Sequence, residues 1–193
     1  MHNIARTLAY GTRDDLRCIR VLNQTLNATN GHILIRRPVD APDGLYKINL
    51  RGELVPLGVP EGNGLLNNYP DLELIKPAFD TMKPLCTIPR EVVGNINIRL
   101  KDADSEQCSM SDAGLFTDLE TPSLGFPFNL PTRVFLNKVY LSIIMTEMMQ
   151  YEAICLLREI RPTDGEFLRT PLVFGLNWGS CALIMPMYPP SKY

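Results

Sequence analysis

Histidine is scarce in this chain, and cysteine lacks the spacing that metal sites need. The two histidines, His2 and His32, lie far apart in the sequence, and the five cysteines include no Cys-x-x-Cys pair. A structural zinc site requires clustered ligands of these two kinds. The sequence therefore predicts no metal site. An odd number of cysteines, several in apolar segments, indicates reduced core thiols and a cytoplasmic setting.

Long apolar runs and a strong charge excess are also missing. No run approaches the roughly 20 apolar residues that span a bilayer, and the first residues lack the apolar core of a signal peptide. The formal net charge of −2 excludes nucleic-acid binding driven by a global basic excess. We expect no membrane partner, and contacts with phosphates only where basic residues gather locally.

Sequence motifs of catalysis are absent as well. The chain contains no glycine-rich phosphate loop, no nucleophile elbow and no His-Glu-x-x-His. The acid pairs Asp14/Asp15 and Asp102/Asp104 lie in polar stretches typical of a solvated surface. We therefore expect no catalytic residue, no cofactor and no enzymatic activity. An enzyme and a structural protein of a virion stay as alternatives.

Strand patterns dominate what is present. Residues 16–22 alternate between apolar and polar, and residues 25–39 read as strand, turn and strand around Asn30-Gly31. Residues 45–60 predict one or two further strands, and 87–102 another. The proline-bracketed segment 69–77 favours an extended connection. Residues 101–130 predict long loops with short strands, and 2–10 predict the end of a helix.

One convincing helix is predicted at 132–152, with Thr132 as its cap. A narrow polar stripe is formed by Lys138, Ser142, Thr146 and Gln150. The apolar residues Leu136, Val139, Tyr140, Ile143, Ile144 and Met148 face the other way, so we expect the helix to lie on a sheet with the stripe left open. Three short apolar runs follow (154–160, 170–176 and 181–187), which predict an antiparallel meander. The predicted class is α+β, with antiparallel sheets and few helices packed on one face.

Four segments together resemble one protein family. "ATNGH" (28–32) resembles the Ala-Thr-Asp-Gly-His turn of bacterial sliding clamps, the β subunit of the replicative DNA polymerase. "YPDLELIKP" (69–77) resembles their Phe-Pro-Asp-Tyr segment, and "ALIMPM" (182–187) their near-terminal Met-Pro-Met strand. "FLNKVYLSIIMTEM" (135–148) resembles the helix before the last meander. Each motif is short, so their order carries the resemblance.

The resemblance implies a DNA-clamp-like fold and a binding groove. In clamps these segments converge on an apolar groove that accepts a short peptide from a DNA polymerase or a clamp loader. Methionine suits such a groove because it is flexible, and histidine offers an apolar face with a hydrogen-bonding nitrogen. Carried over by position, the partner-peptide groove consists of Thr29, Gly31, His32, Leu34, Pro70, Leu74, Ile75, Leu183, Met185, Pro186 and Met187.

Domain organisation follows from the same resemblance. Bacterial clamps have three similar domains per chain and close as a dimer. We expect residues 1–78 to be a shortened clamp-like domain and 79–193 a C-terminal one, with a single enlarged domain over 1–193 as the alternative. Ile33 stands where clamps usually have Arg, and Leu72 where they have Tyr. The chain also continues beyond Met187.

Clamps surround duplex DNA with basic residues that contact phosphates without sequence preference. The stripe predicted here carries one positive charge, Lys138, and Arg6, Arg13 and Arg133 are the other candidates. We therefore expect weak contact with double-stranded DNA. The favoured function is a processivity factor of DNA replication from a phage or mobile element, acting as a homo-oligomer. The alternative is a clamp-fold accessory, decoy or inhibitor protein that does not encircle DNA.

Overall fold

The chain forms two compact units in a computed structural model that describes residues 4, 18–58, 76–118, 120–158 and 170–189. Unit 1 comprises Met1–Asp80 with Asn177–Ala182, and unit 2 comprises Thr81–Leu176 with Leu183–Tyr193. The first division falls near the boundary expected at 78, whereas the return of Asn177–Ala182 to unit 1 was not expected. No helix within the described ranges is long and apolar enough to cross a membrane.

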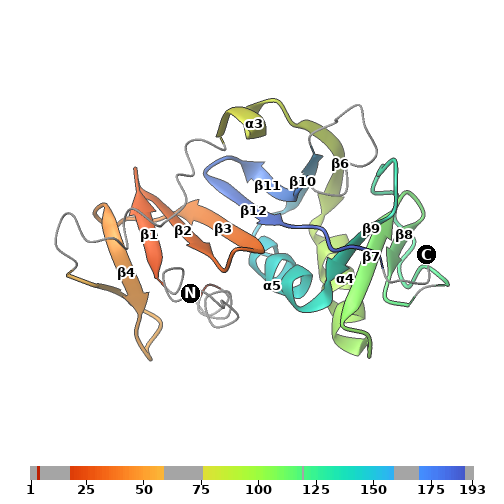
Figure 1. Cartoon of the computed structure of the whole chain (residues 1–193), viewed down its shortest axis with the longest axis horizontal. Helices are drawn as coiled ribbons and strands as arrows, with labels where there is room; N and C mark the ends of the chain where they lie inside the picture. The colour runs from red at the N-terminus through yellow and green to blue at the C-terminus, as the bar shows by residue number, and fades with distance from the viewer. Residues whose placement is uncertain (1–3, 5–17, 59–75, 119, 159–169, 190–193) are drawn as a thin grey trace. The chain divides into compact units, whose positions relative to one another are not determined.

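Unit 1 is built on one sheet whose strands follow in the order β5-β4-β1-β2-β3-β12 (Figure 1). The pairs β1–β2, β1–β4, β2–β3 and β4–β5 are antiparallel. The sequence predicted the strand, turn and strand of 25–39, and this prediction is confirmed. The strand bounds are β1 (Ile19–Leu22), β2 (Thr25–Thr29), β3 (Ile33–Pro38), β4 (Gly44–Ile48), β5 (Leu54–Pro56) and β12 (Ser180–Ile184), of which residues 180–182 belong to unit 1.

The sole tryptophan of the chain lies in the turn before β12 and joins a stack of side chains in unit 1. Its ring is 5.1 Å from that of Phe79, on the short helix α3 (Lys76–Asp80). On β3, the guanidinium carbon of the buried Arg36 lies 3.9 Å from the Trp178 ring centroid. This cation–π contact lets the sheet hold a charged side chain in its core.

The described residues of unit 2 form two groups of strands and the helices α4 and α5 (Figure 1). In the first group β10 lies between β11 and β6, with antiparallel pairing on both sides, and in the second group the order is β8-β7-β9. The meander predicted after the helix is confirmed by β10, β11 and β12. The bounds are β6 (Lys83–Pro89), α4 (Arg90–Asp102), β7 (Gln107–Ser111), β8 (Gly114–Phe116), β9 (Val134–Asn137), α5 (Lys138–Met148), β10 (Ala153–Arg158) and β11 (Leu172–Asn177).

The strand predicted over 87–102 is wrong, because β6 ends at Pro89 and α4 occupies the rest. The buried residues Val93, Ile96, Asn97 and Leu100 recur at the three- and four-residue spacing of a helix face. Ile98, which completed the alternating pattern, is 55% exposed. A short apolar run fits the residue spacing of a helix face as well as that of a strand. Packing against the neighbouring helix α5 favours the helix.

The start of the helix predicted at 132–152 is also wrong. Residues Val134–Asn137 form β9, which pairs with β7 through the β-prone residues Val134, Phe135 and Leu136. The helix α5 begins at Lys138, and its cap is Asn137 rather than Thr132. The Asn137 side chain accepts a hydrogen bond at 3.1 Å from the backbone N–H of Tyr140.

The polar stripe on α5 is not open to solvent at its centre, which corrects a third prediction. Ser142 donates to Oδ1 of Asn97 on α4 at 3.1 Å, and Nδ2 of Asn97 donates to Oγ1 of Thr146 at 2.9 Å. Near the start of α4 and the end of α5, Gly94 leaves room for the side chain of Met149. A Cβ atom at position 94 would lie 3.6 Å from the Met149 sulfur. The stripe therefore faces α4.

The other side of α5 supplies the core of unit 2. Val139 and Tyr140, expected on its buried face, are only half-buried. Burying one large apolar side chain contributes about 1.5–3 kcal/mol, so this helix is a main source of stability for unit 2. The fully buried apolar side chains of α5 are Leu141, Ile143, Ile144, Met145 and Met148.

We predict that Asn97→Ala lowers the free energy of unfolding by about 1–3 kcal/mol, because the hydroxyls of Ser142 and Thr146 each lose a buried partner. Asn95→Ala is the matched control, since Asn95 is exposed on the same helix, and it should change stability by less than about 0.5 kcal/mol. Urea unfolding measures both values. Equal effects of the two substitutions would show that the hydrogen bonds of Asn97 do not hold the helix pair.

Candidate functional site

The turn between β2 and β3 is held by hydrogen bonds from its own side chains. Oδ1 of Asn30 accepts from the backbone N–H groups of His32 and Ile33, both at 2.9 Å. Oγ1 of Thr29 donates to the Ile33 carbonyl at 2.7 Å and accepts from the Gly31 N–H at 3.1 Å. Gly31 has a φ of +89°, a conformation that glycine adopts without strain. The turn therefore presents residues 31 and 32 in a fixed geometry.

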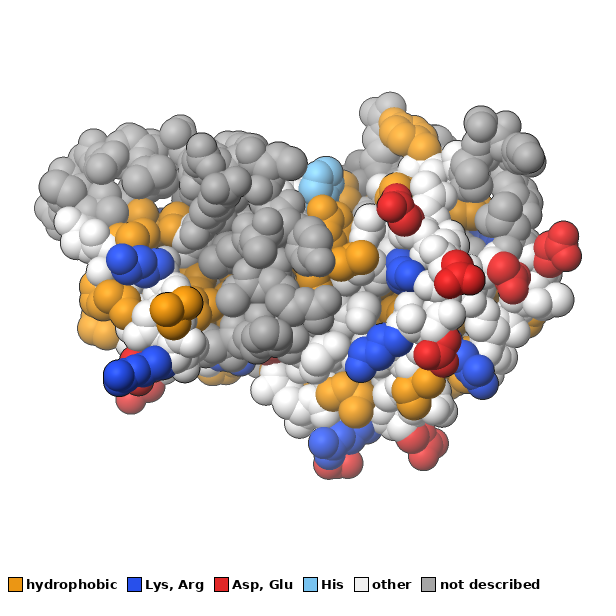
Figure 2. Space-filling model, turned by 90° about the horizontal axis from the view of Figure 1, so that it is seen from below, with side chains coloured by type: hydrophobic (Ala, Val, Ile, Leu, Met, Phe, Trp, Pro, Cys, Tyr) orange, Lys and Arg blue, Asp and Glu red, His pale blue; other side chains and the backbone are white. Residues whose placement is uncertain are grey.

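Exposure divides the predicted groove residues of this hairpin into two pairs. Gly31 and His32 are exposed, and His32 is drawn in pale blue in Figure 2. Thr29 and Leu34 pair with each other across the strands and are both buried. The turn therefore exposes the His32 side chain and the Gly31 backbone, while the side chains of Thr29 and Leu34 are buried.

The near-terminal segment in unit 2 shows a similar division. Leu183 is buried in β12, whereas Met185 is 40% exposed, and Pro186 and Met187 are half-buried. The Met187 N–H donates to the Phe135 carbonyl at 2.8 Å, which forms an isolated antiparallel bridge to β9. Tyr188 follows with 75% of its surface exposed. The segment therefore leaves β12 and is attached to β9 by the backbone of Met187.

The connector residues Pro70, Leu74 and Ile75 lie outside the described residues. The hairpin belongs to unit 1 and the Met-Pro-Met segment to unit 2, and each is described within its own unit. The convergence of the three segments on one groove stays a prediction.

Of the four cations predicted to contact DNA, Arg6 and Arg13 lie outside the described residues. Lys138 donates from Nζ to the Ala103 carbonyl. Arg133 donates from Nε to Oγ of Ser109 at 2.7 Å. The two described cations are thus engaged within unit 2.

Two further cations, Arg99 and Lys101, are exposed on the last turn of α4, in a segment that the sequence predicted to be a strand. The helical spacing of Val93, Ile96 and Leu100 was the signal that would have placed them on a helix. Figure 2 shows basic and acidic side chains interspersed on the face that it draws. Neither sign forms a continuous patch among the described residues there.

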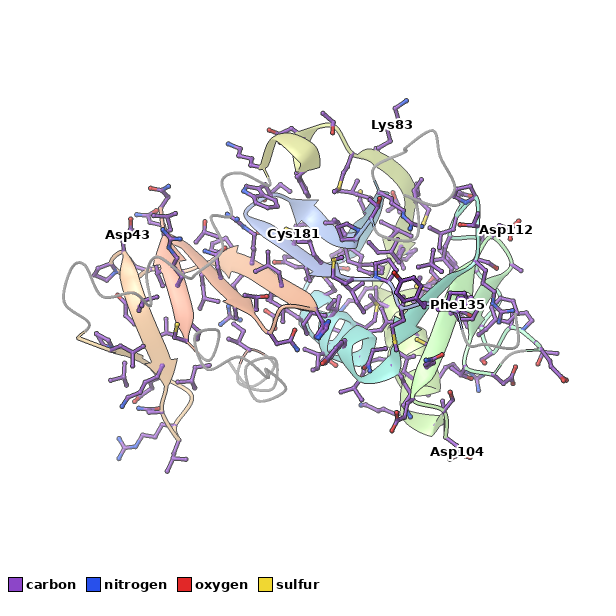
Figure 3. All side chains as sticks on the ribbon, viewed as in Figure 1. Asp43, Lys83, Asp104, Asp112, Phe135 and Cys181 are labelled. Atoms are coloured by element: carbon purple, nitrogen blue, oxygen red, sulfur yellow. The ribbon has the colours of Figure 1, made fainter. Side chains whose placement is uncertain are left out.

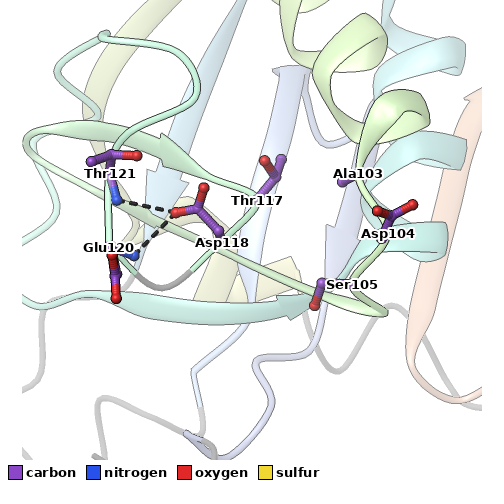
Figure 4. A pocket seen from close by; sticks show the side chains of 7 residues that line it. All are labelled: Ala103, Asp104, Ser105, Thr117, Asp118, Glu120 and Thr121. Carbon is purple, nitrogen blue, oxygen red and sulfur yellow. Dashed lines mark hydrogen bonds between the residues drawn. The ribbon is translucent and has the colours of Figure 1, made fainter.

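A shallow hollow of about 690 Å³ lies between the end of α4 and the turn after β8 (Figure 4). Its carboxylates come from Asp104, Asp118 and Glu120. Backbone N–H groups of Thr121 and Glu120 donate to Asp118 and hold the pKa of its carboxyl below the usual value. Among the described residues, no three His, Cys, Asp or Glu side chains are arranged to bind a metal ion. The hollow contains no predicted groove residue.

The five cysteines form no disulfide with one another, and burial suppresses the ionisation of three of their thiols. Burial raises the pKa of Cys86 to about 11 and that of Cys108 and Cys181 to about 12. A thiolate is the nucleophilic form, so these three side chains are poor nucleophiles at neutral pH. Cys108 and Cys181 are core residues, and Cys86 is half-buried.

Comparison with solved structures identifies the architecture. The β clamp of Helicobacter pylori, bound to a DNA ligase peptide, matches with a TM-score of 0.57 at 11% identity, over 97% of this chain and 62% of the clamp chain. The DNA polymerase III β subunit of Borrelia burgdorferi, in complex with a natural product, matches with 0.57 at 16% identity, over 97% and 61%. The polymerase β subunit of Streptococcus pyogenes matches with 0.52 at 14% identity, over 99% and 64%.

The chain has the fold of the DNA sliding clamps. The expected fold class and the resemblance to clamps are thereby confirmed. The chain spans less than two thirds of the length of these clamp chains. No protein-family model matches the sequence, and no curated protein matches it. At such low identity the likeness establishes the fold alone.

We predict that Thr29→Val destabilises unit 1 by about 1–3 kcal/mol, because the Ile33 carbonyl loses the shorter of its two hydrogen bonds and the Gly31 N–H loses its acceptor. Thr25→Val on the same strand is the control. The Thr25 hydroxyl makes an exposed hydrogen bond of 3.4 Å, so the expected change is below about 0.5 kcal/mol. Urea unfolding followed by Trp178 fluorescence reports on unit 1. If Thr29→Val is no more destabilising than Thr25→Val, the Thr29 hydroxyl does not stabilise the turn.

Proposed function

We propose that this protein is a sliding-clamp-like processivity factor of DNA replication that binds polymerase-type peptides. Support comes from the clamp fold together with exposed side chains at positions that resemble the clamp peptide site, His32 in unit 1 and Met185 in unit 2. One structural neighbour is a clamp bound to a DNA ligase peptide, and another is a clamp in complex with a natural product. The proposed role is binding rather than catalysis.

The chemistry of the two segments favours an extended peptide with large apolar side chains. Met185 is exposed and flexible, and its thioether adapts to apolar groups of different shape. Pro186 cannot donate a backbone hydrogen bond, so the segment around it stays irregular. His32 supplies an apolar face with a polar edge, on a turn already fixed by Asn30. Little ordering of the hairpin is therefore needed on binding.

A fluorescent peptide of the polymerase or clamp-loader type, titrated onto the purified chain, tests this function. We expect saturable binding. The affinity should fall about tenfold in Met185→Ala and in His32→Ala, which corresponds to a loss of about 1.4 kcal/mol of binding free energy for each side chain. Leu176→Ala is the control, because Leu176 is an apolar residue of unit 2 with 51% exposure and no predicted role. Affinity should not change in that variant.

Absence of saturable binding would overturn the proposal. So would an equal effect of Leu176→Ala and Met185→Ala, because the peptide would then recognise exposed apolar surface in general. Circular dichroism of each variant distinguishes a lost contact from lost structure.

We also propose weak contact with double-stranded DNA by a homo-oligomer of this chain. The candidate cations are Arg6, Arg13, Arg133 and Lys138 from the sequence, joined by Arg99 and Lys101 on α4. We expect the affinity for duplex DNA to fall as salt rises, with a slope of about 0.9 per phosphate contact in a double logarithmic plot. The double variant Arg99→Gln with Lys101→Gln should reduce that slope.

Solution mass, with and without duplex DNA, tests assembly in the same samples. A defined oligomer whose DNA affinity depends on salt supports encirclement. A monomer that binds the peptide but not DNA would instead indicate the accessory or decoy role. DNA affinity that is unchanged by salt excludes phosphate contacts as its source.

A further inference from the structure

One row of side chains crosses the sheet β8-β7-β9 and ends at the Met-Pro-Met segment. Ser109 on β7 pairs directly with Phe116 on β8 and with Phe135 on β9. Phe135 in turn is the bridge partner of Met187. Directly opposed residues of antiparallel strands place their side chains on the same face. The row therefore runs through Phe116, Ser109 and Phe135 to Met187, and Figure 3 labels Phe135 within it.

Arg133 lies across this row. Its guanidinium carbon is 3.8 Å from the ring centroid of Phe116 and 5.7 Å from that of Phe135. Nε donates to Oγ of the buried Ser109 at 2.7 Å, and an Nη2 hydrogen bond of 3.4 Å reaches the Asp118 carbonyl. A planar guanidinium can stack on rings and donate in its own plane at the same time. Arg133 thus contacts one residue on each of the three strands, and it also contacts the turn after β8 through Asp118.

The Met187 end of the row depends on Phe135. The described attachment of the near-terminal segment to β9 is a single bridge, in which the Phe135 carbonyl accepts from the Met187 N–H. A segment attached by one hydrogen bond loses that attachment when the acceptor moves, because no neighbouring bond of a ladder replaces it. A displacement of Phe135 consequently releases Met187 from β9.

We propose that Arg133 is a positioning residue for peptide binding. It holds Phe135 against Phe116 and Ser109, and through the Phe135 carbonyl it fixes Met187 and the exposed Met185. This inference rests on the proposed peptide-binding function. It differs from the role that the sequence indicated for Arg133, a contact with DNA phosphates, and the two roles make opposite demands on the side chain.

Lysine separates these demands. A phosphate contact needs positive charge, and lysine keeps it. The positioning role needs the planar fork that stacks on Phe116 while Nε donates to Ser109, and lysine has neither the plane nor the Nε donor. Arg133→Lys therefore preserves a DNA contact and abolishes the positioning contacts.

The experiment records methionine-methyl NMR spectra and peptide affinity on the full chain. In Arg133→Lys we expect the Met187 methyl signal to shift or broaden, while Met145, fully buried in α5, keeps its signal and shows that the fold is intact. Peptide affinity should fall at least threefold. Arg90→Lys, at an exposed arginine of α4 that pairs with Glu152, should leave both readouts unchanged.

A second variant removes the stack without touching the charge. Phe116→Leu eliminates the nearest ring, so the Met187 signal should move in this variant too, and peptide affinity should again fall. An unchanged Met187 signal and unchanged affinity in both variants overturn the proposal, as does a loss of DNA affinity alone in Arg133→Lys. If the unsubstituted chain binds no peptide, the proposed function fails, and the Met187 signal alone then decides whether Arg133 holds the segment.

Discussion

The contact between α4 and α5 through Asn97 is the interaction on which unit 2 depends. The amide of Asn97 is both acceptor and donor, toward Ser142 and Thr146, which lie one turn apart on the partner helix. This arrangement fixes the two helices in a single register, because a shift by one residue breaks both bonds. With the register fixed, the apolar side of α5 is committed to the core, and β9, which runs directly into α5, is held in place for the pairing with β7.

Local chemistry explains which parts of the fold could be predicted. The β2–β3 hairpin is specified by side chains that hydrogen-bond to their own turn, and the meander after α5 consists of apolar runs separated by turn residues. The segment 87–102 was wrongly predicted as a strand. The spacing of Val93, Ile96 and Leu100 fits a helix, whereas the spacing of Ile96, Ile98 and Leu100 fits a strand. Only the position of α5 decides between the two periods, and that position depends on residues far along the chain.

The candidate site stays a prediction. The exposed His32 on a glycine turn and the Met-Pro-Met segment follow from short motifs that resemble those of clamps. The proposed role of Arg133 does not follow from a short motif. Its contacts are with Ser109 and Phe116, on two strands that a long loop separates from Arg133 in the sequence. From sequence alone an arginine beside a strand indicates a solvated charge, and only cross-strand register shows the rings beneath it.

The path of the backbone limits how the molecule can be divided. Asn177–Ala182 return to unit 1 after most of unit 2 has been formed, and β12 is the neighbour of β3 in the sheet. A recombinant fragment that stops at Asp80 would lack both this strand and Trp178, the partner of Arg36 and Phe79. During synthesis on the ribosome, unit 1 must likewise await its last strand until Ala182 has emerged.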